Sequence, residues 1–106
     1  MNRQTPNGSG NGNTRVPLSM QGEKVRFPVR FPLKAMMDAS IDDSINKARL
    51  VAVFRTLELD YLFSDKKISS KGNYVSFTYK IKVMNKTQFD RLYVMLRQVE
   101  GLKYAL

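Results

Sequence analysis

The sequence predicts an α+β fold in which a four-stranded antiparallel sheet carries two helices on one face. Three observations indicate this class. Apolar and polar side chains alternate strictly from Val75 to Val83, which is typical of a strand with one buried face. The polar segment 69–74, which contains Gly72, comes directly before this run and predicts a tight hairpin turn. Two further segments repeat apolar residues at helical spacing, and each lies between strand-like stretches.

The first strand is predicted from the alternation of side chains between Val25 and Met37. Pro28 and Pro32 interrupt its ladder, because a proline has no backbone N–H to donate. We therefore expect the paired strand to begin near Phe31, with residues 25–30 as an extended lead-in.

The first helix is predicted to begin at Ser40, whose hydroxyl can accept a hydrogen bond from an early backbone N–H group. Asp42 and Asp43 follow at the positive end of the helix, and we expect it to continue to about Thr56. Its apolar residues form two stripes on roughly opposite sides: Ile41, Ile45, Ala48 and Ala52, and then Leu50, Val53, Phe54 and Leu57. A helix that is apolar on two faces needs two packing partners, so one stripe covers either the domain's own strands or termini or a dimer interface.

The second strand is predicted within Leu59–Ser69, where the alternation is poor. This pattern, together with Lys66 and Lys67, favours an edge strand or a bulge. Its expected packing residues are Tyr61, Phe63 and Ile68. The third strand should extend from Tyr74 to about Met84.

The second helix is predicted to begin after a cap at Asn85 or Thr87 and to end at Gly101. A short last strand, Leu102–Leu106, follows it. The expected core face of the helix consists of Phe89, Leu92, Tyr93, Leu96 and Val99.

The element order β-α-β-β-α-β, closed with right-handed crossovers, gives a ferredoxin-like sandwich with strand order 4-1-3-2. The alternation assigns the following residues to the helix side of the sheet: Leu33, Ala35, Phe77, Tyr79, Ile81, Leu102, Tyr104 and Leu106. It assigns a polar and basic set to the open side: Lys34, Ser76, Thr78, Lys80, Lys82 and Lys103.

The composition argues against catalysis. The chain contains no cysteine and no histidine, which removes the usual thiol nucleophile, the commonest general base and the commonest transition-metal ligands. We therefore expect a protein that is not an enzyme and that uses no cofactor and no metal.

The chain divides into a polar tail, residues 1–24, expected to be disordered, and a single domain, residues 25–106. No apolar stretch is long enough for a membrane span or a secretory signal, so we expect a cytoplasmic protein without membrane contact. The net charge is +9, and residues 65–86 hold six basic side chains and one acidic side chain.

The hairpin segment 69–74, the following Ser76 and Thr78, the helix Gln88–Leu96 and the short strand that ends in leucine resemble the YbeD-like family of small uncharacterised bacterial proteins. The resemblance covers about residues 27–106. It implies a ferredoxin-like fold similar to that of ACT domains, which are amino-acid-sensing modules, and a stand-alone binding or regulatory role without an assigned reaction.

Two readings of the hairpin turn remain open. Either it is purely structural, or Lys71, Asn73 and Tyr74 form a recognition patch for a ligand or a protein partner. In ACT-like modules the ligand binds near the loop between the first strand and the first helix, which here contains Ser40 but no glycine. Ser40 and the N–H groups of the first helical turn form a second candidate site, for a small anion.

The main alternative function is weak, non-specific nucleic-acid binding. The proposed basic surface consists of Lys34, Lys80, Lys82 and Lys103, with the basic tail beside it. Only Tyr74 is available for base stacking on the third strand, so the expected affinity is electrostatic and sensitive to salt.

Overall fold

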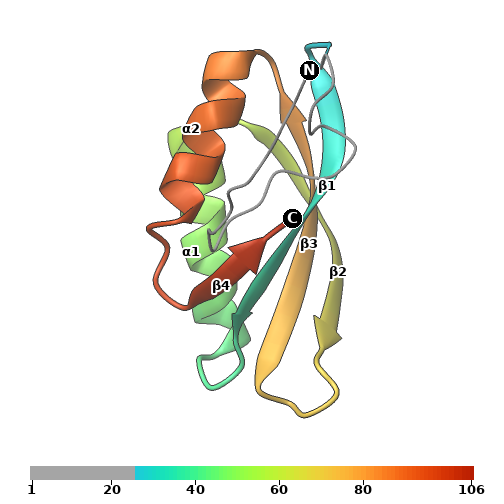
Figure 1. Ribbon diagram of the computed structural model, residues 1–106, viewed down its shortest axis with the longest axis vertical. Coiled ribbons are helices and arrows are strands. Elements are labelled where there is room, and N and C mark those ends of the chain that lie inside the picture. The colour runs from blue at the N-terminus through green and yellow to red at the C-terminus, as the bar shows by residue number, and fades with distance from the viewer. Residues whose placement is uncertain (1–25) are drawn as a thin grey trace, which may run out of the picture.

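The structure, a computed structural model, describes residues 26–106. Its elements are β1 (Val29–Asp38), α1 (Asp43–Thr56), β2 (Asp60–Ile68), β3 (Tyr74–Val83), α2 (Lys86–Leu96) and β4 (Leu102–Ala105) (Figure 1). Neighbouring strands pair antiparallel in the order β2-β3-β1-β4. Read from the other edge, this is the predicted order 4-1-3-2, so the ferredoxin-like fold class is confirmed. The predicted disordered tail, residues 1–24, lies outside the described residues.

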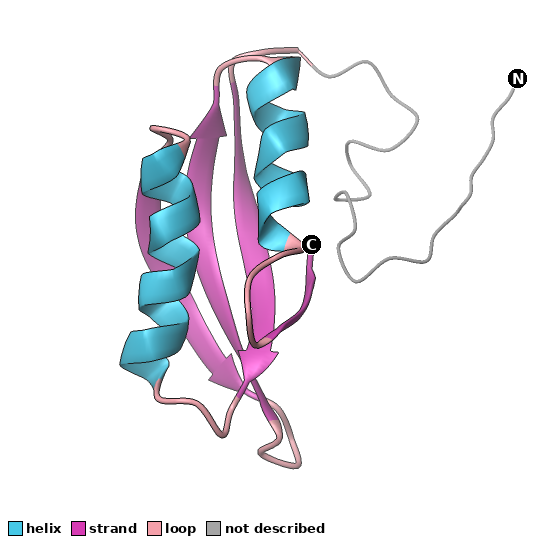
Figure 2. Cartoon of the chain, turned by 90° about the vertical axis from the view of Figure 1, so that its left-hand side faces the viewer, coloured by secondary structure: helices cyan, strands magenta, loops and turns pink. Residues whose placement is uncertain are grey.

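Both helices cover the same face of the sheet, as Figure 2 shows. The core lies between these two layers, because each strand turns every second side chain toward the helices. The fully buried strand residues include Leu33, Ala35, Phe77 and Ile81, which the alternation assigned to this side. Within residues 26–106, neither helix has the length and apolar character needed to cross a membrane.

β1 begins at Val29, two residues before the predicted start, and Pro32 lies inside it. Pro32 pairs with Lys80 of β3 on one side. Its missing N–H would point to the other side, as does the N–H of Lys34, which donates to the oxygen of Leu106 at 3.0 Å. β4 is short and pairs with β1 only near Ala35, so none of the described strands lies opposite Pro32 there. Within residues 26–106 the proline therefore removes no hydrogen bond between strands, although β1 is a central strand.

The prediction that Ser40 caps α1 is wrong. Asp42 occupies the N-cap position without a side-chain cap bond, and the helix begins at Asp43. The Ser40 hydroxyl instead donates to Oδ1 of Asp38 at 2.7 Å. The predicted end at Thr56 is confirmed.

The two apolar stripes of α1 have different environments. One stripe, Leu50, Val53, Phe54 and Leu57, is buried against the sheet. The other stripe faces outward over most of its length: Ile45 is 44% exposed, and Ala48 and Ala52 are exposed as well. Its first residue, Ile41, is half-buried beside Gly101.

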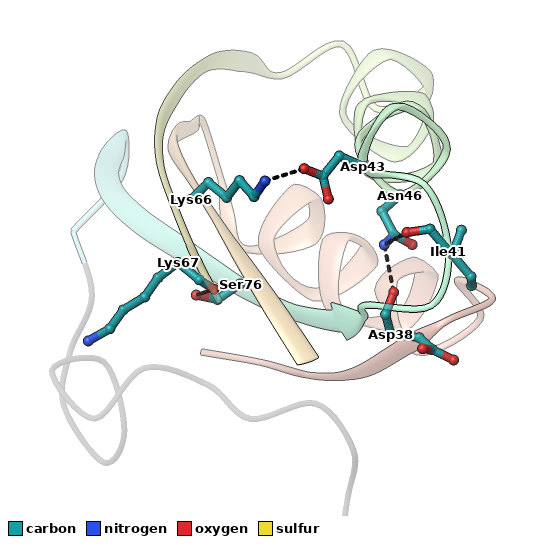
Figure 3. A network of polar contacts seen from close by, with 7 residues as sticks. All are labelled: Asp38, Ile41, Asp43, Asn46, Lys66, Lys67 and Ser76. Carbon is teal, nitrogen blue, oxygen red and sulfur yellow. Dashed lines mark hydrogen bonds and ion pairs between the residues drawn. The ribbon is translucent and has the colours of Figure 1, made fainter. Parts of the chain in front are cut away.

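β2 is an edge strand with a bulge between Phe63 and Asp65, as predicted. The ring of Tyr61 packs 5.5 Å from that of Phe54, whereas Ile68 is 57% exposed and contributes little packing. Lys66 reaches across to the start of α1 and forms an ion pair with Asp43 (Figure 3).

The β2–β3 hairpin closes through a hydrogen bond of 2.9 Å from the N–H of Ser69 to the oxygen of Tyr74. Gly72 has φ +76°, a left-handed conformation that glycine adopts without steric cost. The predicted tight turn is therefore confirmed.

α2 begins after Asn85, whose side chain accepts from the N–H of Gln88 at 2.8 Å. The helix ends at Leu96, earlier than the predicted end at Gly101, and a turn connects it to β4. Its core face agrees with the prediction, since Phe89, Leu92, Tyr93 and Leu96 are buried.

The predicted facing is confirmed for Leu102, which packs against the core, but it is wrong for Tyr104 and Leu106. The register between β1 and β4 shifts between Met36 and Met37, so Ala105 becomes the buried residue, paired with Ala35. Tyr104 pairs with Met36 on the open side of the sheet and is 37% exposed. An irregularity in this four-residue strand reverses the facing of the residues that follow it, because side chains alternate with a period of two.

Candidate functional site

A hollow of about 470 Å³ lies at the end of the molecule where three connections meet, and we name it the end hollow. The β1–α1 turn and the β2–β3 turn lie together at the lower end of Figure 1. Backbone hydrogen bonds hold the three connections together: the N–H of Ala39 donates to Asn73 at 3.1 Å, and that of Asp38 donates to Gly101 at 2.9 Å. The lining consists of Asp38, Ala39, Ser40, Gly72, Asn73, Tyr74, Gly101, Leu102 and Lys103.

Asp38 supplies the negative charge of the end hollow. Its Oδ1 accepts hydrogen bonds from the backbone N–H of Ser40 at 2.8 Å and from the Ser40 hydroxyl at 2.7 Å. These two bonds lower the pKa of Asp38 below its usual value, and the positive charge of Lys103 lowers it further, against a partial desolvation that raises it. Asp38 is therefore ionised at neutral pH.

Lys103 supplies the positive charge. Its Nζ lies 5.5 Å from the ring centroid of Tyr74, within the range of a cation–π contact. The ion pairs found among residues 26–106 do not include one between Lys103 and Asp38. The two opposite charges thus line one hollow without neutralising each other directly.

Two glycines line the end hollow, but neither comes from the β1–α1 connection, where ACT-like modules bind their ligand. The β1–α1 connection contains no glycine, but Gly72 and Gly101 both line the hollow with positive φ angles of +76° and +88°. A Cβ at Gly101 would lie 3.1 Å from Cδ1 of Ile41, whereas one at Gly72 would meet nothing within 4 Å. Gly72 therefore leaves backbone accessible to a bound molecule, and Gly101 allows close packing behind it.

The structure brings together four of the residues singled out in the sequence, from all three connections: Ser40, Asn73, Tyr74 and Lys103. Lys71 is exposed at the tip of the same turn but does not line the end hollow. Lys103 does not belong to the basic sheet surface, because it lies at the end hollow, whereas Lys80 and Lys82 lie along β3 opposite Pro32 and Arg30. Lys34 lies on β1 opposite Thr78, on the same open side.

Most of the chain matches one protein family. Residues 22–106 match the family described as "Protein of unknown function (DUF493)". The chain belongs to the DUF493 family. This confirms the resemblance to the small YbeD-like bacterial proteins.

Relatives of this DUF493 protein include a "UPF0250 protein" of Shewanella halifaxensis, which is 43% identical over 58 residues, 55% of this chain and 66% of the relative. A "UPF0250 protein" of Shewanella piezotolerans is 40% identical over 58 residues, with the same shares of 55% and 66%. These matches span just under two thirds of the length of the curated relatives.

The fold of this DUF493 protein is also found in a solved structure. The solution structure of protein HP0495 from H. pylori aligns with a TM-score of 0.65, covering 87% of this chain and 96% of that chain. The sequence identity is 15%, so the likeness shows a shared fold alone.

Asn46 supports the end hollow of this DUF493 protein from behind, and the sequence analysis did not single it out. Its side chain is fully buried, and its Nδ2 donates to the backbone oxygens of Asp38 at 2.9 Å and of Ile41 at 3.3 Å (Figure 3). A signal was present, because Asn46 precedes Leu50 and Val53 at helical spacing on the buried stripe of α1. A polar residue in such a stripe indicates a buried hydrogen bond.

The end hollow carries groups that can bind a small molecule. It offers an ionised carboxylate, an ammonium group, a hydroxyl, an amide and an aromatic ring on a largely backbone frame. The Ser40 hydroxyl already donates to Asp38, a group with a lowered pKa that is a weak base. These groups can recognise a small molecule that carries both charges.

Proposed function

We propose that this DUF493 protein is a non-catalytic, regulatory binding module whose end hollow takes a small zwitterionic molecule of the amino-acid class. The observation that carries the proposal is the placement of Asp38 and Lys103 in one hollow without an ion pair between them. A hollow of about 470 Å³ lies within the size range of small-molecule sites.

Each charge of the ligand has a complementary group. The Asp38 carboxylate accepts hydrogen bonds from the ligand's ammonium group through the oxygen that Ser40 does not use. The Lys103 ammonium pairs with the ligand's carboxylate while the Tyr74 ring holds it in place. Gly72 leaves room for the ligand to approach the backbone of the turn.

Isothermal titration calorimetry against each common amino acid tests this function. We expect a saturable heat from at least one of them, and about tenfold weaker binding for Lys103→Ala and for Asp38→Asn. Lys71→Ala is the matched control, because it removes the same charge as Lys103→Ala from a neighbouring position outside the lining. Thermal melts of the variants check that each remains folded. The absence of heat from every amino acid at millimolar concentration would contradict the proposal.

Self-association is the second part of the proposed function, and the outward stripe of α1 supports it. Ile45 is 44% exposed and lies at helical spacing from the exposed Ala48 and Ala52. A second copy of the chain would bury this stripe and add to a small core. Sedimentation velocity should show a dimer that Ile45→Lys dissociates, and a monomer at high micromolar concentration would exclude this part.

A further inference from the structure

A groove of about 440 Å³ crosses the sheet on the side opposite the helices, and we name it the open-face groove. Its floor contains one row of three directly paired residues: Pro32 of β1, Lys80 of β3 and Leu62 of β2. In the next row of the sheet Arg30 and Asp60 also line the groove, and Lys82 is paired between them at its edge. The groove lies at the opposite end of β3 from the end hollow, and the inference drawn from it does not rest on the proposed function.

The open-face groove concentrates positive charge. Arg30 lies directly opposite Lys82, and Lys80 follows two residues along β3 on the same face. None of these three cations takes part in an ion pair with another residue of the range 26–106. Like charges directly opposite one another in a sheet are destabilising, so an anionic partner that approaches this face relieves a repulsion already present.

The open-face groove is also apolar, which distinguishes it from a purely electrostatic surface. Leu62 is 64% exposed, and Pro32 is exposed on the other side of Lys80. Burial of an aliphatic side chain across this row, over Leu62, the methylene groups of Lys80 and Pro32, would remove water from their apolar surfaces.

The chemistry of the open-face groove fits an acidic peptide better than a nucleic acid. The Tyr61 ring packs with Phe54 and Tyr79 on the helix side, 5.5 Å and 6.3 Å from their ring centroids, so it is not available for base stacking. Asp60 lies beside the cations and repels a uniformly charged phosphate backbone. A peptide can instead place its carboxylates over the cations and a neutral side chain near Asp60.

We propose that the open-face groove binds an acidic, extended segment of another protein, with an aliphatic side chain on Leu62 and Pro32 and carboxylates on Lys80 and Arg30. Rows of the sheet that are two residues apart are about 6.6–7 Å apart along the strand. Alternate residues of an extended peptide have the same spacing. A segment in which an aliphatic residue and an acidic residue are two positions apart turns both side chains toward the sheet, because successive side chains point to opposite faces. Such a segment therefore matches the row of Lys80 and the row of Arg30.

Fluorescence anisotropy with labelled peptides tests this inference. The probe is a short synthetic peptide in which leucine and glutamate take turns at every second position and serines fill the positions between them, so that an extended chain presents both on one face. Two control peptides replace either every leucine by serine or every glutamate by glutamine. We expect the probe to bind more tightly than either control by about tenfold or more. The protein variants are Lys80→Glu and Leu62→Ala, each expected to weaken binding of the probe about tenfold or more. Arg91→Glu on α2 is the matched charge control, because Arg91 is exposed and lies outside the groove.

Both contributions must be present for the inference to hold. Binding of the probe that responds to Lys80→Glu but not to Leu62→Ala would show a merely electrostatic surface and would overturn it. Tighter binding of single-stranded poly-uridine than of the peptide at physiological salt, unaffected by Leu62→Ala, would assign the groove to nucleic acid instead. Failure of the probe to bind at millimolar concentration would also overturn the inference. Loss of amino-acid binding at the end hollow would leave it unaffected.

Discussion

The side-chain amide of Asn46 donates to the backbone oxygen of Asp38 at 2.9 Å, so the first turn of α1 is fastened to the end of β1. The same amide donates to Ile41, while its Oδ1 is buried without a partner among the described residues. Asn46 therefore fixes the backbone of the β1–α1 connection, which carries the side chains of Asp38 and Ser40. Asn46 does not itself line the end hollow, but it determines the shape of the hollow by holding this backbone.

We expect Asn46→Ala to lower the free energy of unfolding by about 2 kcal/mol, because it leaves two backbone oxygens without their donor and opens space in the core. Asn46→Asp should cost more at neutral pH, since it also buries a charge. Urea denaturation followed by circular dichroism measures both. Ser44→Ala, at an exposed position of the same helical turn, is the control and should change stability little. An Asn46→Ala protein as stable as the wild type would contradict the role given to the amide.

Gly101 and Gly72 form a matched pair for a second prediction. Both have positive φ, but a Cβ at Gly101 would also lie 3.1 Å from Ile41, whereas one at Gly72 meets open space. We expect Gly72→Ala to cost about 1 kcal/mol for the left-handed backbone alone, and Gly101→Ala to cost about 2–3 kcal/mol because repacking adds to it. Thermal or urea unfolding measures the difference, and equal effects would show that close packing at Gly101 does not matter.

Tyr93 gives a prediction about alkaline pH. Its hydroxyl is buried without a hydrogen-bond partner in the described chain, and burial raises the pKa of this phenol well above its usual value of 10.0. Above pH 10.0 the unfolded chain releases the proton and the folded chain retains it, so stability falls as the pH rises. We expect Tyr93→Phe to be as stable as the wild type or about 1 kcal/mol more stable at neutral pH, and to lose less stability above pH 10.0.

Unfolding curves at neutral pH and above pH 10.0 measure this difference. Tyr104→Phe, which removes a partly exposed hydroxyl, is the control. Parallel losses of stability in the wild type and Tyr93→Phe would refute the account.

Ser40 gives a prediction about acid pH. Its N–H and hydroxyl lower the pKa of Asp38, so this carboxylate stabilises the folded state above its unfolded pKa of 3.8, and the contribution is lost as the pH falls through the lower folded pKa. Ser40→Ala removes one of the two bonds, and we expect the pKa of Asp38 to rise toward 3.8. Carbon-detected NMR titration of the carboxyl group measures the shift. Ser70→Ala, in the neighbouring turn, should leave the Asp38 titration unchanged.

The order of the strands and helices follows from local patterns that the sequence displays directly. The alternation in β3 and the helical spacing in α2 both reflect burial on one face, so they could be predicted. The start of β1 could not be predicted in this way. Pro32 is tolerated inside β1 because β4 is too short to lie opposite it, and β4 begins 70 residues further along the chain. The facing of Tyr104 and Ala105 likewise depends on a register shift between two strands rather than on the sequence of either.

The composition of the end hollow also depends on segments that are far apart in the sequence. Asn73 and Tyr74 stood out because their turn is distinctive, and Ser40 stood out as a potential cap. Only the meeting of three connections shows that Lys103 belongs with them and Lys71 does not. The interaction of Ser40 with Asp38 was missed because a serine before a helix more often caps it, and the choice between these partners depends on backbone angles.

The mismatch in length between β1 and β4 has a consequence for how the sheet can grow. The first half of β1, from Val29 to Leu33, has no described strand on its β4 side, so it forms a step in that border of the sheet. A strand from another molecule that entered this step would meet Pro32, which offers no N–H group. At the other border, all nine residues of β2 are exposed and none is a proline. The two borders of the sheet therefore differ in their backbone: Pro32 interrupts the N–H groups along the step beside β1, whereas no proline interrupts those of β2.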